Sequence, residues 1–206
     1  MEGTAKYHHG DLRRELMDAA EIELAEKGVE RFSLRGVAKR AGVSHGAPAH
    51  HFGDVEGLLT AVAARGYDRF IEAQDRREQV AGQEPAAKLA ASGLGYLDFA
   101  VAHPALFRLM SSSDKTDKSD PQLASAADRA FEKLVDHIRD ITHLDPKTND
   151  QAMSRVLSTW AVAHGLADLQ VANRLGRADF FDPLSAGQRD TAFSDIILRA
   201  AGIPTP

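Results

Sequence analysis

Apolar residues recur at intervals of three and four along most of the chain, the spacing that places them on one face of an α-helix. An early stripe of this kind is closed by Gly28 and predicts the first helix. Its members are Leu12, Leu16, Ala19, Ala20 and Leu24. We find no run that alternates apolar and polar residues as a half-buried strand does. The predicted fold class is therefore all-α.

A pair of short, capped helices is predicted between residues 33 and 52. Ser33 is placed to cap the first helix, and Gly42 supplies the left-handed residue that ends it. Ser44 is placed to cap a second helix, from about His45 to His51, after a tight turn. This spacing is typical of a helix-turn-helix, whose second helix reads the major groove of DNA.

A long helix is predicted to follow this pair and to join two domains. Asp54 is placed to cap it, and it runs to about Arg77, beyond which Pro85 marks a break. We therefore divide the chain into a three-helix bundle that carries the helix-turn-helix, over residues 1–53, and a larger helical domain over residues 54–206.

The second domain is predicted to contain one buried helix and several others. Residues 89–102 hold a single charge, Asp98, and a helix that is apolar on all sides is a buried one. Pro104, Asp145–Pro146 and Ser185 are each placed to begin a further helix, the last with a capping box.

Positive charge is concentrated in the predicted helix pair. Residues 31–53 contain four cationic side chains and no carboxylate, whereas residues 1–30 carry eight carboxylates against four cations. The four cations of the pair are Arg31, Arg35, Lys39 and Arg40. A local cationic face suits a polyanion such as DNA, although four cations on a helix pair can also form an ordinary solvated face.

Composition restricts the class of protein further. With 206 residues, 43% hydrophobic content and a net charge of −5, the chain can bury a core and is not a general nucleic-acid coat. It has no cysteine, and hence no disulfide or thiolate chemistry. Its first dozen residues are polar, and no apolar run nears the roughly 20 residues that span a bilayer. We therefore expect a soluble, cytoplasmic protein with no membrane partner.

Two parts of the chain carry a family resemblance. The stretch from Tyr7 to Leu59 resembles the amino-terminal domain of the TetR (tetracycline-repressor-like) family of bacterial transcriptional regulators. The segments Phe99–Met110 and Trp160–Gly165 are similar to a subgroup whose carboxy-terminal domain bears a Trp, His, Gly signature.

This resemblance implies a transcriptional regulator, commonly a repressor, that a small-molecule effector releases from a palindromic operator of double-stranded DNA. Family members pair through their last two helices, so a homodimer is implied. The apolar stripes of those helices could otherwise face only their own core. Effector binding would tilt the helix that begins at Asp54 and change the separation of the two DNA-reading heads.

The residues expected to contact DNA lie around the helix pair and in the amino-terminal arm. They are Lys6, Ser33, Arg35, Lys39, Ser44, His45, Gly46, Ala47, Ala49 and His50. The family usually places a Tyr at the position of Ala49 and a Lys near Val55. Without these two phosphate contacts, affinity is expected to be lower unless Lys6, Arg35 and Lys39 compensate.

Histidines stand where side chains would read bases or phosphates. His45 and His50 are the better candidates, whereas His51 is expected to pack beside Phe52. Histidine titrates near pH ~6.5, so any that lies against phosphate gains charge as the pH falls. We predict that operator affinity rises on mild acidification.

A candidate effector site is predicted in the second domain, with a mostly apolar lining and a few polar groups. Its residues are Tyr96, Asp98, Phe99, Phe107, Met110, Phe131, Trp160 and His164. Trp160 and His164, four residues apart, could close one wall. Asp98 in an apolar helix must find a partner, water or a ligand. Aromatic residues at helical spacing can also form plain core.

Other classes of protein are less well supported. The chain has no cysteine nucleophile, glycine-rich phosphate loop or His-Glu-x-x-His motif, so we expect no enzyme, no catalytic residue and no cofactor. Adjacent histidines point to different faces of a helix, so we expect no metal site. The alternative left open is a helical ligand- or partner-binding protein of the same fold with weak or lost operator binding.

Overall fold

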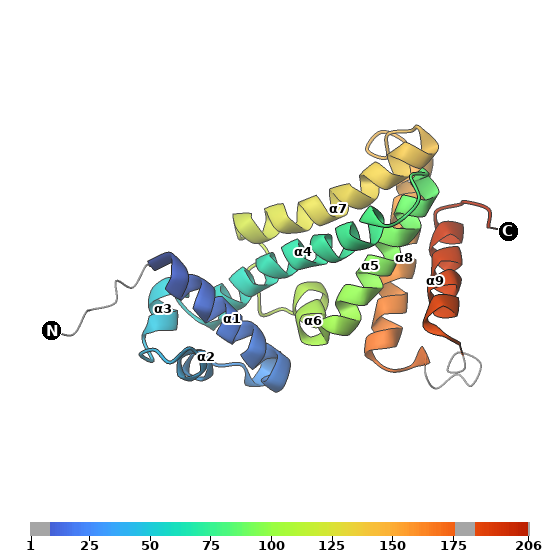
Figure 1. Cartoon of the computed structure of the whole chain (residues 1–206). Helices are drawn as coiled ribbons and strands as arrows, with labels where there is room; N and C mark the ends of the chain where they lie inside the picture. Colours follow the sequence, from blue (N-terminus) through green and yellow to red (C-terminus); the bar gives the residue numbers. More distant parts are fainter. Residues whose placement is uncertain (1–8, 176–183, 206) are drawn as a thin grey trace. The chain divides into compact units, whose positions relative to one another are not determined.

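The computed structural model describes residues 9–175 and 184–205 (Figure 1). Its elements are α1 (His9–Lys27), the 3-10 helix η1 (Val29–Arg31), α2 (Leu34–Ala41), α3 (Ala47–Phe52), α4 (Val55–Gln79), α5 (Pro85–Ala102), α6 (Pro104–Ser112), α7 (Pro121–Thr142), α8 (Asp150–Val171) and α9 (Ala186–Ala200). Within the described residues there is no strand, and the prediction of an all-α fold is confirmed.

The chain forms two compact units whose segments alternate along the sequence. Unit 1 contains the chain up to Gly66 and the segment Ala105–Ser125, and unit 2 contains Tyr67–Pro104 and the chain from Ala126 onward. Helix α4 is continuous across the boundary and contributes to both units. The functional division at residues 53 and 54 stays a prediction.

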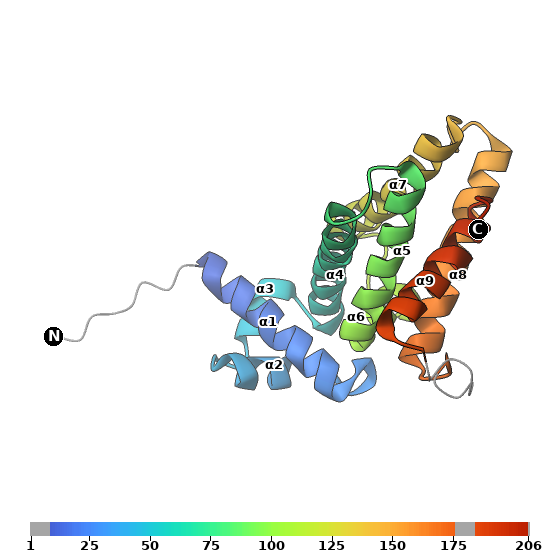
Figure 2. The ribbon, with the colours of Figure 1, turned by 45° about the vertical axis from the view of Figure 1, so that its right-hand side comes forward.

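In unit 1, α1 covers the helix-turn-helix with the apolar stripe that the sequence predicts. Leu16 and Leu24 of α1 are fully buried, as are Val37 and Ala38 of α2. Figures 1 and 2 both show the two helices side by side. Burial of one leucine side chain stabilises a fold by about 1.5–3 kcal/mol. At Gly28, with a φ of 69°, the chain leaves α1 as predicted.

Helix α6 packs closely on α4 within unit 1. A Cβ added at Gly66 of α4 would lie 2.6 Å from the Sδ of Met110 and 3.0 Å from the Cδ1 of Leu106. Beyond α6, the amide of Asp117 donates a hydrogen bond to the Oγ1 of Thr60 at 2.8 Å. The segment after residue 104 is therefore held against the first half of α4.

In unit 2, α5, α7, α8 and α9 share one apolar core. Its central members are Leu89, Val135, Ile138, Ala152, Val156, Ile197 and Ala201. Glycines allow α5 to approach its neighbours: a Cβ at Gly93 would lie 2.5 Å from the Cδ1 of Ile197, and one at Gly95 would lie 2.5 Å from the Cα of Gln74. Helix α5 is buried along most of its length, as predicted, but its Asp98 is exposed.

Two predicted helix starts are confirmed and one is wrong. Helix α6 begins at Pro104, and Ser185 caps α9 in a capping box. Asp145–Pro146, in contrast, does not begin a helix. Helix α8 starts at Asp150, where the side chain of Asn149 accepts a hydrogen bond from the amide of Ala152 at 3.0 Å.

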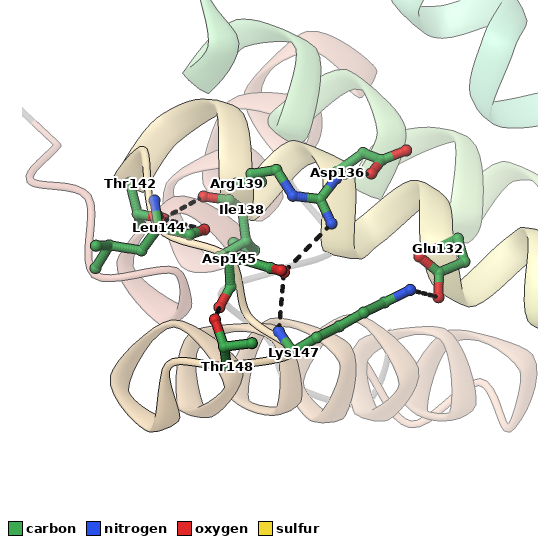
Figure 3. Close-up of polar contacts among 9 residues, drawn as sticks. All are labelled: Glu132, Asp136, Ile138, Arg139, Thr142, Leu144, Asp145, Lys147 and Thr148. Carbon is green, nitrogen blue, oxygen red and sulfur yellow. Dashed lines mark hydrogen bonds and ion pairs between the residues drawn. The ribbon is translucent and has the colours of Figure 1, made fainter.

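Figure 3 shows why Asp145 does not cap a helix. Its carboxylate accepts a hydrogen bond from the amide of Lys147 at 3.1 Å, and the guanidinium of Arg139 lies 3.5 Å away. Its backbone oxygen accepts from the amide of Thr148 at 3.0 Å. These bonds close a turn of the kind that aspartate favours, and the helix begins only after it.

Candidate functional site

The first helix of the helix-turn-helix begins and ends as the sequence predicts. The amide of Gly36 donates a hydrogen bond to the Oγ of Ser33 at 3.1 Å, which caps α2. Gly42 ends the helix with a φ of 69° and a ψ of 29°, in the left-handed region. The amide of Val43 then donates to the carbonyl of Ala38 at 3.0 Å, and the chain turns toward α3.

The start of the second helix differs from the prediction. Helix α3 begins at Ala47, with Gly46 at the cap position and no side-chain cap. Ser44 instead accepts a hydrogen bond from the amide of Ala47 through its backbone carbonyl, at 3.0 Å, so the prediction that Ser44 caps α3 is wrong. Pro48 lies in the first turn of the helix, where its fixed φ and missing amide hydrogen are tolerated.

Most residues predicted to contact DNA lie on the surface of unit 1. Those exposed are Arg35, Lys39, Ser44, His45, Gly46, Ala49 and His50, while Ser33 and Ala47 are partly buried. Lys6 lies outside the described residues. Val55, near which the resemblance would place a Lys, is 38% exposed. The surface is therefore accessible, and the contacts themselves stay predictions.

One cation of the helix pair already has partners within unit 1. Arg40 of α2 bonds to two carboxylates of α1, Glu26 at 2.5 Å and Glu23 at 3.0 Å. The hydrogen bond from Arg40 lowers the pKa of the Glu26 carboxyl. A Cβ at Gly36 would overlap the carboxylate of the buried Glu23, so glycine leaves room for this pair. The cationic surface that remains consists of Arg31, Arg35 and Lys39.

The residues predicted to bind an effector are divided between the two units. Phe107 and Met110 belong to unit 1, where Met110 packs on Gly66. The other six belong to unit 2. Phe107 is buried and Met110 partly buried.

A polar pair in unit 2 joins α5 to α8. The hydroxyl of Tyr96 lies 2.7 Å from the Nδ1 of His164, and burial raises the pKa of this hydroxyl. The rings of Tyr96 and Phe70 are nearly perpendicular, with centroids 4.7 Å apart. Trp160 packs against Phe131 of α7 at 5.7 Å and is 47% exposed. This cluster has the aromatic and polar character that the sequence predicts for a ligand site.

Asp98 has a protein partner, which the sequence did not identify. Its carboxylate accepts hydrogen bonds from the Nε and Nη2 of Arg77 at 2.6 and 2.9 Å. The Nη1 of Arg77 reaches Asp190 of α9 at 2.8 Å. Arg77 therefore ties α4 to α5 and α9, and an effector is not needed to satisfy the Asp98 charge.

Two kinds of site are absent from the part of the chain that the structure describes. Among them, no three or more His, Cys, Asp or Glu side chains are grouped so as to hold a metal ion. None of the helices in that part of the chain combines the length and the apolar character needed to cross a membrane.

Two family descriptions match this chain, one in its amino-terminal part and one in the larger part that follows. Residues 16–62 match the family described as bacterial regulatory proteins, tetR family. Residues 89–189 match the family described as tetracyclin repressor-like, C-terminal domain.

Similar curated proteins are transcriptional regulators. The chain is 35% identical over 79 residues to the HTH-type transcriptional regulator BetI of Paraburkholderia xenovorans (strain LB400). It is 37% identical over 79 residues to the regulator of the same name from Burkholderia mallei (strain NCTC 10229). Each match covers 38% of this chain, which spans only about 40% of the length of these relatives.

Similarity to solved structures extends over nearly the whole chain. A protein with unknown function from Rhodococcus sp. RHA1 is 32% identical, with a TM-score of 0.78, over 98% of this chain and 100% of that chain. A TetR-like transcriptional regulator from the same organism shares the fold at 16% identity, with a TM-score of 0.65, over 96% of this chain and 99% of that chain. With its capped helix-turn-helix and both family matches, the chain belongs to the tetR family of bacterial regulatory proteins.

Proposed function

We propose that this protein is a DNA-binding transcriptional regulator, acting as a repressor, whose homodimer reads a palindromic operator. The observation that carries the proposal is the exposed surface around α3, where His45, Ala49 and His50 face solvent. In a helix-turn-helix the second helix enters the major groove. One such helix reads few base pairs, and two-fold symmetry doubles the number that is read.

Phosphate contacts are assigned to the cations beside this helix. Arg35 and Lys39 are exposed on α2, and Lys6 precedes the described residues. Each phosphate that a cation neutralises releases counterions, so affinity falls as salt rises. Exposed Arg35 and Lys39 support a binding mode in which α2 meets the DNA backbone while α3 meets the bases.

The outer faces of α8 and α9 support a homodimer. Leu157 and Leu169 of α8 are 50% and 36% exposed, and Ile196 of α9 is 39% exposed. Gly165 of α8 has open space where a Cβ would stand. Large apolar side chains exposed on two neighbouring helices fit the same two helices of a second copy, in a four-helix bundle.

These exposed residues differ from the stripe that the sequence suggested for dimerisation. In α8 that stripe consists of Val156, Trp160, Ala163, His164, Ala167 and Val171. Val156, Ala163 and Ala167 are buried within unit 2 and serve its own core, whereas Trp160 is exposed. The proposed dimer interface instead uses the exposed apolar residues of α8, Leu157 and Leu169.

A small-molecule effector is proposed to bind among the aromatic side chains of unit 2. Trp160, His164 and Gly165 carry the resemblance to the Trp-His-Gly subgroup, and Tyr96 bonds to His164. Because α4 is common to both units, an effector that prefers one arrangement of unit 2 would alter the helix that follows the helix-turn-helix.

Selection of bound duplexes from a random DNA pool tests the DNA-binding proposal. An enriched palindrome is expected, and the double variant Arg35→Ala/Lys39→Ala should flatten the dependence of log K on log salt by about 3.6, because the dimer loses four phosphate contacts worth about 0.9 each. A matched control is Arg76→Ala/Lys118→Ala, which removes two exposed cations outside the helix pair. Repeating the binding assay with cell metabolites would identify what releases the complex.

A second candidate function is a helical ligand- or partner-binding protein that does not bind an operator. The exposed Ala49 and Val55 favour it, since the family usually places a Tyr and a Lys near these positions. Selection without enrichment of any duplex at low salt would support this candidate and contradict the first.

A further inference from the structure

The carboxyl end of α3 is held by a side chain of α1. The Nη1 of Arg13 donates a hydrogen bond to the backbone oxygen of His51 at 3.3 Å. The central carbon of the same guanidinium lies 4.4 Å from the centroid of the Phe52 ring. All three side chains are partly buried. One cation therefore contacts two consecutive residues in the last turn of the helix.

Helix α3 needs support from outside because it is short. It has six residues, whereas isolated helices of fewer than about 12 residues are marginal in water. At its start, Gly46 provides no side-chain cap. At its end, the amides of Gly53 and Asp54 donate to two of its last carbonyls at 2.8 and 3.1 Å. Arg13 adds a donor for a third, the His51 carbonyl.

The chemistry of arginine suits this position. A cation at the carboxyl end of a helix complements the helix dipole, and a guanidinium over an aromatic ring adds a cation–π attraction. The planar fork allows arginine to donate a hydrogen bond and to stack at the same time, which the point charge of a lysine does less well.

The contact lies beside the proposed reading surface. The rings of His50 and His51 are in edge contact, with centroids 5.4 Å apart, and His50 is exposed. Fixing His51 and Phe52 therefore fixes the direction in which the preceding turn presents His50 and Ala49. We propose that Arg13 is a positioning residue for DNA recognition, which orients α3 from inside unit 1 and does not itself contact DNA. This inference rests on the proposed function.

The experiment compares full-length variants on two duplexes, the palindrome selected by the unaltered protein and a scrambled duplex of equal length. Arg13→Gln keeps a donor and loses the charge and the stacking, and Arg13→Lys keeps the charge alone. Arg14→Gln is the matched control, because it removes the same charge from the neighbouring, exposed position. Affinity is measured by fluorescence anisotropy at several salt concentrations, well below the thermal midpoint of each variant.

Arg13→Gln is expected to weaken binding to the selected duplex about 10-fold, to leave binding to the scrambled duplex unchanged, and to keep the salt dependence of the unaltered protein. The affinity of Arg13→Lys for the selected duplex should lie between those of Arg13→Gln and the unaltered protein. Phe52→Leu, which removes the ring beneath the guanidinium, should also weaken binding to the selected duplex. The binding free energy lost by Arg13→Gln/Phe52→Leu should be less than the sum of the losses of the two single variants.

Several results would overturn the inference. Equal affinity of Arg13→Gln and the unaltered protein for the selected duplex would show that α3 does not depend on Arg13. Equal losses on both duplexes with a flatter salt dependence would make Arg13 a phosphate contact instead. Failure of the unaltered protein to select any duplex would defeat the proposed function together with this inference, whereas the first two results would leave the proposed function intact.

Discussion

Cations in unit 1 and unit 2 have different neighbours. In unit 2, Lys133 of α7 lies 2.8 Å from Asp75 and 2.9 Å from Glu78 of α4, and Arg77 bonds to carboxylates of α5 and α9. In unit 1, Arg35 and Lys39 stand exposed on α2. Unit 2 thus uses Lys133 and Arg77 to join its own helices, whereas the helix pair of unit 1 holds Arg40 against α1 and presents Arg35 and Lys39 to solvent.

The apolar surfaces of the two units show the opposite contrast. Unit 2 exposes Leu157 and Ile196 on its outer helices, while the helix pair exposes small and polar side chains around α3. Surface charge suits a polyanion, and surface apolar area suits a protein partner. The contrast fits the two partners proposed above, DNA at the helix pair and a second copy of the chain at α8 and α9.

The largest expected effect comes from placing a charge on the apolar face of unit 2. Leu157→Glu should convert the dimer to monomer, because each protomer would bury a carboxylate in the proposed interface. Operator affinity should fall on the order of 100-fold, since the two half-sites are then bound independently. Analytical ultracentrifugation and fluorescence anisotropy measure both quantities. Gln151→Glu, at an exposed position of the same helix, is the control, and an unchanged mass for Leu157→Glu would refute this interface.

Two glycines allow the packing of the units to be compared. Gly95→Ala should lower the free energy of unfolding by about 2–3 kcal/mol, because its Cβ would meet the backbone of α4, at the Cα of Gln74. Gly36→Ala should lower the free energy of unfolding by less, because its Cβ would meet only the flexible end of the Glu23 side chain and because alanine favours a helix more than glycine does. Urea unfolding of both variants measures the difference. A larger loss for Gly36→Ala would mean that the Glu23–Arg40 pair is as rigid as the backbone of unit 2.

The next effect concerns the acid stability of unit 2. Burial alone would raise the pKa of the Glu78 carboxyl, but hydrogen bonds from His137 and Lys133 lower it to about 2 from an ordinary value of 4.5. A lowered folded-state pKa gives stability that is present above pH 4.5 and is lost as the pH falls through about 2. Glu78→Gln should therefore be less stable than the unaltered protein at pH 7, and this difference should shrink toward pH 2.

Thermal unfolding at several pH values between 7 and 2 measures this difference. Asp75→Asn is a matched control, because Asp75 pairs with the same Lys133 and its side chain is 47% exposed. It should change stability less than Glu78→Gln does. A pH-independent difference between Glu78→Gln and the unaltered protein would contradict the assigned role of the Glu78 charge.

The smallest effect is expected at the reading surface of unit 1. Protonation of histidines that lie against phosphate should raise operator affinity a few-fold between pH 8 and pH 6 at constant salt. The variant His45→Gln/His50→Gln should lack this rise. Anisotropy titrations at both pH values test it, and identical affinities of the unaltered protein at the two pH values would rule it out.

Much of the helix pair is predictable from local sequence. Ser33, Gly42 and the stripe of α1 have the predicted roles because caps, left-handed glycines and apolar spacing act over a few residues. The two errors, at Ser44 and Asp145, have one cause. At each position the backbone oxygen accepts a hydrogen bond from the amide three residues later, Ala47 after Ser44 and Thr148 after Asp145, so a turn forms there and the helix begins only after it.

The amino-acid sequence by itself determined that the chain is all-α, where most helices begin, and that a capped pair of helices carries local positive charge. Only the tertiary structure decided which charges remain available. Arg40 is paired with Glu26 and Glu23, which lie 14 and 17 positions earlier in the sequence. Arg77 is paired with Asp98 and Asp190, which lie 21 and 113 positions later. Periodicity describes one helix at a time, whereas an ion pair depends on which helix faces reach each other, and packing alone sets that.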